Sequence, residues 1–340
     1  MQDAGKGWQI YGKRLSEKGG YITMNSDAPL TSLNQSVKYL EAALRLDPKN
    51  ASTIQALVET KEAIGRIDAQ ANPTKGMQDF SDALSLIAQA PESDRQSVEM
   101  QQIRARLLDL LGWGLGQMGD FKGSLARLEE ARPIVDAQAA ADPSNLGTGF
   151  RRMDLYRSIG LVEGYAGHPK ESLEYLETST KILDDLVRRD AANRTYPVLL
   201  AEMQGRVANL LVEAGRKPDA EPYARASVAY FRTLGERPDA TPSQLMECVR
   251  SLAEIGVPAL RDYPAALRFA QRANQLAEGK NPGVLGYLAE AYALNKNYSK
   301  AAESAERGLG DMGPTKPGEP PSRLRGWLRQ EAGEYKAKAR

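Results

Sequence analysis

The sequence has one cysteine and one histidine among its 340 residues. Cys248 alone cannot form an intrachain disulfide, and together with His168 it is too little to build a zinc site from cysteine and histidine ligands. We therefore expect no metal ion and no other cofactor. Cys248 falls in an apolar helical pattern with Leu245, Val249 and Leu252, which predicts a buried small side chain instead of a reactive thiol.

Long hydrophobic runs and an excess of one charge are also lacking. No stretch of 18 apolar residues occurs, and the first residues, Met1 to Lys6, lack the apolar core of a secretory signal. The sequence has 45 basic and 44 acidic side chains, so the net charge is only +1. No strong electrostatic field therefore attracts nucleic acid or an anionic membrane. We expect a soluble chain, cytoplasmic as the sequence stands. An extracytoplasmic location stays open if the chain is part of a larger membrane-anchored protein.

Aromatic residues are scarce, at 6%, whereas 41% of the residues are hydrophobic. Alanine and leucine supply much of that fraction, and strand-like alternation does not persist in any segment. This composition favours helices packed through small side chains and disfavours a β-rich fold. The sequence therefore predicts an all-α protein.

Glycines recur at a fixed interval in the middle of the chain. Gly119, Gly167 and Gly215 are each 48 residues apart (167−119 = 48; 215−167 = 48). Each follows one apolar helical pattern and precedes another, where a helix needs a left-handed residue to end it. Eight residues before the first two glycines, the pattern has a further small residue after an apolar one, in the pairs Leu111-Gly112 and Ile159-Gly160. The interval therefore predicts repeated helical hairpins.

This pattern resembles the tetratricopeptide repeat, in which small residues mark both helices, an aromatic residue follows the turn and a proline ends the unit. Two further segments match it, through Ser36, Leu40, Ala43, Asp47 and Pro48 near the N-terminus and through Leu285, Leu288, Ala289, Tyr292, Asn297, Tyr298, Ala301, Ala305 and Gly308 near the C-terminus. The usual period is about 34 residues, so the middle units should have longer helices. The resemblance implies a right-handed superhelical solenoid of about seven antiparallel helical hairpins.

The hairpins can be assigned along the chain, and they form one continuous repeat domain over residues 1–310. Residues 311–321, rich in proline and glycine, are expected to be a linker, and residues 322–340 a C-terminal capping helix. The expected hairpins pair Trp8–Lys18 with Ser32–Leu46, Ala51–Asp68 with Gly76–Ala90, then fill the three 48-residue units, a sixth that closes near Gly279, and a seventh from Pro282 to Leu309.

No group of residues predicts catalysis. Gly114 to Gly119 has the GxGxxG spacing of nucleotide sites, but no strand precedes it, and so helix crossing and helix termination explain it. His168 fits a turn. Adjacent carboxylates such as Asp184 and Asp185 diverge by about 100° on a helix and cannot converge on one substrate. We therefore predict a protein that is not an enzyme and has no catalytic residue.

The resemblance implies a binding groove on the inner face of the first helix in each unit. The corresponding residues are Arg106, Asp109, Trp113, Asp154, Arg157, Leu161, Glu202 and Asn209. Trp113 could anchor a peptide in the groove or pack between hairpins, and the sequence leaves both positions open. The expected partner is a protein or peptide of unknown identity, and the oligomeric state is not predicted.

A narrower resemblance concerns the segment Gln78–Leu84 with the connector before it, and the turn Ala141–Asn145. They look like the repeat tails that follow the catalytic domain in some bacterial eukaryotic-like serine/threonine protein kinases. The HRD and DFG motifs of a kinase are absent from the sequence, so such a relation would make this a detached regulatory part. The alternative to a binding scaffold is a small-molecule sensor whose pocket is closed by the segment Tyr21–Pro29.

Overall fold

The computed structural model describes residues 28–314 and 322–339, and within these ranges every regular element is a helix. The prediction of an all-α fold is confirmed. The chain divides into two compact units, Met1–Ile182 (unit 1) and Leu183–Arg340 (unit 2). The expected helix Trp8–Lys18 and residues 315–321 of the expected linker lie outside the described residues, and the proposed domain limits at 310 and 321 stay predictions.

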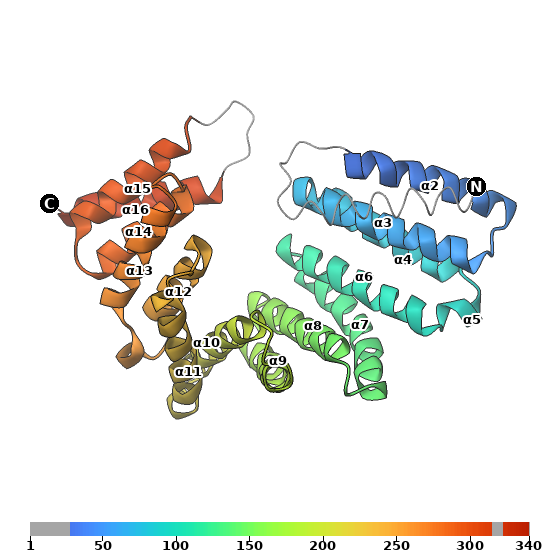
Figure 1. The fold of residues 1–340 in the computed structure, drawn as a ribbon, viewed down its shortest axis with the longest axis horizontal. Helices are drawn as coiled ribbons and strands as arrows, with labels where there is room; N and C mark the ends of the chain where they lie inside the picture. Colours follow the sequence, from blue (N-terminus) through green and yellow to red (C-terminus); the bar gives the residue numbers. More distant parts are fainter. Residues whose placement is uncertain (1–27, 315–321, 340) are drawn as a thin grey trace. The chain divides into compact units, whose positions relative to one another are not determined.

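Unit 1 is a series of long helices that pack on their neighbours in sequence. The helix α2 packs on α3, and α3/α4 and α6/α7 are antiparallel hairpins joined by α4–α6 and α7–α8 contacts (Figure 1). The elements are α2 (Ala28–Leu46), α3 (Ala51–Ala71), α4 (Pro73–Gln89), α5 (Glu92–Arg95), α6 (Val98–Gln117), α7 (Phe121–Ala141), α8 (Leu146–Tyr165) and α9 (Pro169–Arg189), whose last residues belong to unit 2.

Unit 2 continues the same pattern with shorter helices. The hairpins α10/α11, α12/α13 and α14/α15 pack on one another in chain order, and α16 covers α15 and α14. The elements are α10 (Tyr196–Glu213), α11 (Lys217–Glu236), α12 (Pro242–Glu254), the 3₁₀ turn η1 (Pro258–Leu260), α13 (Tyr263–Leu276), α14 (Pro282–Leu294), α15 (Tyr298–Asp311) and α16 (Arg323–Ala339). Cys248 of α12 is buried as expected, and burial raises the pKa of its thiol to about 12.

The predicted capping helix forms and packs through its apolar stripe. Leu328 is fully buried, and Ala332 and Tyr335 are buried beside it against residues of α14 and α15. A terminal helix of this kind removes the apolar end of a repeat array from water. The polar side of α16 therefore becomes the end surface of unit 2.

The three glycines of the 48-residue interval end α6, α8 and α10 in the same way. Their φ angles are +88° at Gly119, +87° at Gly167 and +75° at Gly215, in the left-handed region that glycine enters without strain. Around Gly167, the amide of His168 donates to the carbonyl of Glu163 at 2.9 Å, and the amide of Gly167 donates to Gly164 at 3.2 Å. These two bonds form a Schellman motif, and the prediction of glycine helix ends is confirmed.

We expect Gly167→Val to lower the free energy of unfolding by about 1–2 kcal/mol, because a β-branched residue is strained at positive φ. No atom lies within 4 Å of a Cβ built at Gly167, so the loss measures backbone strain alone. Urea denaturation should detect it. Gly167→Asn, which tolerates the left-handed region better, should cost less, and equal stability of the valine variant and the unmodified chain would contradict the helix-end assignment.

Two further glycines let the helices of a hairpin cross closely. A Cβ at Gly112 of α6 would lie 2.7 Å from Cγ of Leu128, and a Cβ at Gly160 of α8 would lie 2.8 Å from Cγ of Leu176. The Oγ of Ser172 also donates to the carbonyl of Gly160 at 2.7 Å. The second helix of each hairpin is thereby held against the first, and the first helices are left to form a surface of their own.

Candidate functional site

The first helices α3, α6 and α8 of unit 1 contact one another directly, because α3 touches α6 and α6 touches α8. We call their shared surface the inner face of unit 1. The 48-residue interval places Arg106 and Asp109 of α6 at the positions of Asp154 and Arg157 of α8. Acidic and basic side chains therefore exchange places from one helix to the next.

Arg106 joins α6 to α3 through a two-point ion pair. Its Nε donates to Oε1 of Glu62 at 2.7 Å, and its Nη2 donates to Oε2 at 2.6 Å. Glu62 is buried, and Arg66 on the next turn of α3 also donates to it at 3.1 Å. The hydrogen bonds from Arg106 to Glu62 raise the pKa of Arg106. The guanidinium of Arg106 therefore serves mainly to hold the inner face together.

Arg157 and Asp154 pair within α8. The Nε of Arg157 donates to Oδ1 of Asp154 at 3.0 Å, and both side chains remain about one-third exposed, at 31% and 33%. A pair three residues apart on an exposed helix face contributes little to stability. The Nη2 of Arg157 also donates to Oδ1 of Asp154, and the one-third exposure of the pair leaves it within reach of a ligand.

Asp109 lies between these pairs and is incompletely satisfied. Its Oδ1 is buried and accepts no hydrogen bond from any residue of the described chain. Burial raises the pKa of Asp109 to about 7, and the charge of Asp154 adds to this, whereas Arg157, Ser158 and Arg66 oppose it. A buried acceptor without a donor is costly, so Asp109 lowers the stability of the inner face.

Trp113 and Leu161 stand at equivalent positions of α6 and α8 but differ in exposure. Trp113 is partly exposed on the last turns of α6, whereas Leu161 is buried, with 8% of its surface exposed. Leu161 therefore offers almost no surface to a ligand. The sequence pattern missed this because a register alone does not show how closely neighbouring helices approach.

The other two predicted residues, Glu202 and Asn209, lie on α10 in unit 2. The Oδ1 of Asn209 accepts a hydrogen bond from the backbone amide of Gly256 at 2.6 Å, which ties α10 to the segment after α12. Both residues line a small cavity of about 60 Å³, together with Arg250 and Glu254. The structure thus gives Asn209 a positioning role inside unit 2.

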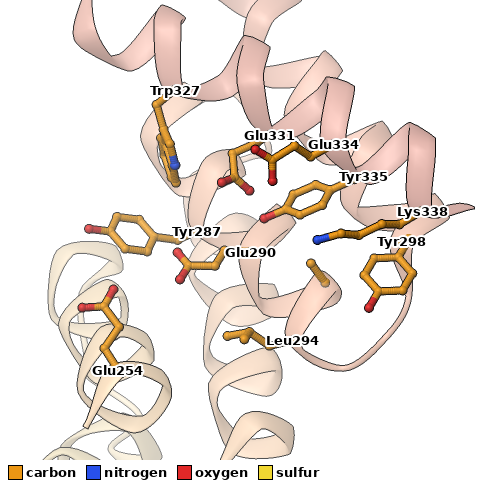
Figure 2. Close-up of a pocket in the computed structure, with 11 residues that line it drawn as sticks. Glu254, Tyr287, Glu290, Leu294, Tyr298, Trp327, Glu331, Glu334, Tyr335 and Lys338 are labelled. Atoms are coloured by element: carbon orange, nitrogen blue, oxygen red, sulfur yellow. The ribbon is translucent and has the colours of Figure 1, made fainter. Parts of the chain in front are cut away.

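A larger cavity in unit 2 was not anticipated from the sequence. It has a volume of about 660 Å³ and lies among α12, α14, α15 and α16 (Figure 2), and we call it the acidic–aromatic cleft. Its lining consists of Glu254, Tyr287, Glu290, Ala293, Leu294, Tyr298, Trp327, Glu331, Glu334, Tyr335 and Lys338. One signal was present in the sequence, since Glu290 is the only charged residue of the otherwise apolar helix α14.

Among residues 28–314 and 322–339, no group of three or more His, Cys, Asp or Glu side chains is arranged to hold a metal ion. Within the same residues, no helix combines the length and apolar character needed to span a bilayer.

No family model matches the sequence, and no curated protein sequence matches it either. Among solved structures, the apo form of RapI is similar, with a TM-score of 0.54, 10% identity, and coverage of 90% of this chain and 96% of that one. Pseudomonas aeruginosa PilF is similar with a TM-score of 0.43 and 18% identity, over 82% of this chain and 94% of that one. A putative kinesin light chain of Podosopora anserina, described as having nearly identical TPR-like repeats, is similar with a TM-score of 0.42 and 17% identity. The match covers 62% of this chain and 95% of that one.

Proposed function

We propose that this chain, whose fold is a tetratricopeptide-like helical repeat, is a non-catalytic scaffold that binds a protein or peptide segment on the inner face of unit 1. The observation that carries the proposal is that this face exposes a large ring and a charged pair: Trp113 of α6 is partly exposed, and the Asp154 and Arg157 side chains of α8 are 33% and 31% exposed. The helix α6 contacts both α3 and α8. An extended peptide supplies backbone N–H and carbonyl groups suited to such acceptors and donors.

The ion pairs around Asp109 favour binding without rearrangement. Arg106 is fixed on Glu62 from α3, and Arg157 is fixed on Asp154 within α8. Because these long side chains are already ordered, a ligand would not have to immobilise them again, which lowers the entropy cost of association. Trp113 adds a large, partly exposed ring on the same helix as Asp109, and tryptophan often supplies much of the contact energy in an interface.

The sensor alternative has less support. It relies on the segment Tyr21–Pro29, of which residues 21–27 lie outside the described part of the chain. The cavities of unit 2 are lined by several charged side chains, unlike the closed apolar pocket expected of such a sensor. The relation to bacterial kinase tails remains a hypothesis, and the proposal does not depend on it.

Affinity capture from the native source, followed by binding measurements with the captured partner, tests the scaffold. We expect Trp113→Ala and Arg157→Ala each to weaken binding by about 1–3 kcal/mol, since the first removes contact area and the second removes charged donors. Trp113→Ala is the cleaner variant, because Arg157→Ala also leaves Asp154 without its ion pair. Circular dichroism should show unchanged helix content for both.

The matched controls lie on the second helices of their hairpins. Glu177→Ala on α9 and Arg225→Ala on α11 change charge without touching the inner face, and Arg225 forms an ion pair with Glu221 on its own helix. Both should bind the partner as the unmodified chain does. If these controls lose affinity while the Trp113 variant does not, the partner binds elsewhere and the inner face is not the site.

A further inference from the structure

The acidic–aromatic cleft is assembled from helices that are far apart in the sequence. Glu254 ends α12, Tyr287 and Glu290 project from α14, and Trp327 and Glu331 come from α16 (Figure 2). A Cβ on Gly286 of α14 would overlap the Trp327 ring, so this glycine allows α16 to seat its tryptophan at the wall. All of these elements belong to unit 2, and the cleft is independent of the inner face of unit 1.

Three carboxylates of the cleft have no cationic partner. Among the described residues, Glu254, Glu290 and Glu331 form no ion pair, and Oε2 of Glu331 is buried without a hydrogen bond. Arg250 donates to Glu247 at 3.1 Å, and Lys338, which also lines the cleft, lies over the Tyr298 ring at 5.8 Å. The lining has four glutamates and one lysine, so acidic side chains outnumber basic ones in the cleft.

The protonation equilibria reflect this imbalance. Burial raises the pKa of Glu290 to about 7, and the charges of Glu254 and Glu331 add to the effect. Burial also raises the pKa of Glu254, although the charges of Arg250 and Arg206 lower it. In the same way, burial raises the pKa of Glu331, although a hydrogen bond from the Trp327 indole and the charge of Lys338 lower it. A cation entering the cleft would stabilise the ionised carboxylates against this burial and, at Glu290, against the charges of Glu254 and Glu331.

The aromatic lining indicates which cation fits. The rings of Tyr287 and Trp327 lie 5.8 Å apart with planes inclined by 62°, and the buried Tyr335 also lines the cleft. A planar guanidinium can stack on such rings and donate to carboxylates from its edge, whereas an ammonium is a compact charge that strongly retains its water. A cavity of about 660 Å³ also has room for flanking peptide residues.

We infer that the acidic–aromatic cleft binds an arginine side chain presented by a partner peptide, with the guanidinium against the wall formed by the Tyr287 and Trp327 rings and its N–H groups donating to Glu290 and Glu331. Charge complementarity with the unpaired carboxylates selects a cation. The aromatic walls and the planar geometry select arginine over lysine. The cleft would therefore act as a specificity pocket at the C-terminal end of the repeat array.

The test uses the full chain and a fluorescein-labelled peptide of sequence Ala-Ala-Arg-Ala-Ala with its C-terminus amidated. Two comparison peptides replace the arginine with citrulline or lysine, and fluorescence anisotropy reports binding. Citrulline keeps the shape but loses the charge, so we expect its affinity to fall about tenfold or more. The lysine peptide should bind more weakly than the arginine peptide. Equal binding of the arginine and citrulline peptides, or no saturable binding with millimolar peptide, would overturn the assignment.

Variants locate the site. Glu290→Gln and Glu331→Gln should each lower the affinity for the arginine peptide about fivefold or more, since each removes a charged acceptor. Glu303→Gln makes the same change at an exposed position of α15 that does not line the cleft. Its affinity for the arginine peptide should be within about twofold of that of the unmodified chain. Because Glu290 is buried near other carboxylates, its replacement should not lower the melting temperature. An equal loss in the Glu303 variant would contradict the site.

The pH dependence has a definite sign. Because the pKa of Glu290 is about 7 without ligand and a bound cation favours the ionised carboxylate, affinity for the arginine peptide should rise between about pH 6 and pH 8. Glu290→Gln should flatten this rise. Trp113→Ala should leave arginine-peptide binding unchanged, so failure of the inner-face proposal and failure of this one can be distinguished. A rise that persists in the Glu290 variant would show that another group controls binding.

Discussion

Replacing Leu128 with alanine should lower the free energy of unfolding by about 3 kcal/mol, because it leaves a cavity in a tightly packed crossing. The side chain of Leu128 is fully buried and packs with Leu108, Ala131 and Ile159. It also fills the space directly in front of Gly112, where a Cβ would lie 2.7 Å from Cγ of Leu128. The cost of the cavity should therefore depend on what stands at position 112.

A double-mutant cycle measures that dependence. In the unmodified chain, Gly112→Ala should be destabilising by about 1 kcal/mol, since Leu128 would have to move. In the Leu128→Ala background the same change should be stabilising, because the new methyl group enters the cavity and alanine favours the helix. Urea denaturation with constant m values should give a coupling free energy of about 1 kcal/mol or more between the two sites.

Gly326→Ala is the control for this cycle, because no atom lies within 4 Å of a Cβ at that position of α16. Its effect should be equal in both backgrounds. Additive behaviour of Gly112→Ala and Leu128→Ala, to within about 0.5 kcal/mol, would mean that α6 and α7 do not cross where the structure places them.

Deleting residues 282–340 should leave a folded protein of lower stability. The deletion removes α14, α15 and α16 and exposes the surface by which α13 packs on α14. In a repeat array each hairpin is stabilised mainly by its neighbours, so the loss of an end hairpin should not unfold the others. We expect the melting temperature to fall by about 10 °C.

Circular dichroism checks this result. The helical signal per residue of the truncated chain should stay close to that of the whole chain. Removal of residues 322–340 alone should have a smaller effect in the same direction, because only α16 is lost. Collapse of nearly all helical signal in the longer deletion would show that the whole chain folds in one cooperative step instead of as coupled hairpins.

Local signals explain how much of the fold was predictable. Gly119, Gly167 and Gly215 each end a helix through contacts within six residues, and such contacts can be inferred from spacing. The small residues Gly112 and Gly160 were likewise visible as a repeated pattern. The helix boundaries of the middle hairpins therefore followed from sequence, as did the all-α class.

The candidate site was less predictable. The register correctly placed Arg106, Asp109, Asp154 and Arg157 on first helices in contact, but it did not show that Arg106 is engaged by Glu62, a residue 44 positions earlier. It also assigned Leu161 to the groove, where packing buries it. Ion pairing and burial depend on distances between helices, which the period of a repeat does not specify.

The sequence by itself thus determined an all-α repeat, its hairpins and the glycines that end its helices, because each depends on residues close together in the chain. Only the tertiary structure decided where unpaired charge collects. Glu254, Glu290 and Glu331 are separated by 36 and 41 residues (290−254 = 36; 331−290 = 41), and they meet in one cleft because α12, α14 and α16 pack together. Their shared environment, and with it the chemistry of the cleft, arises from that packing.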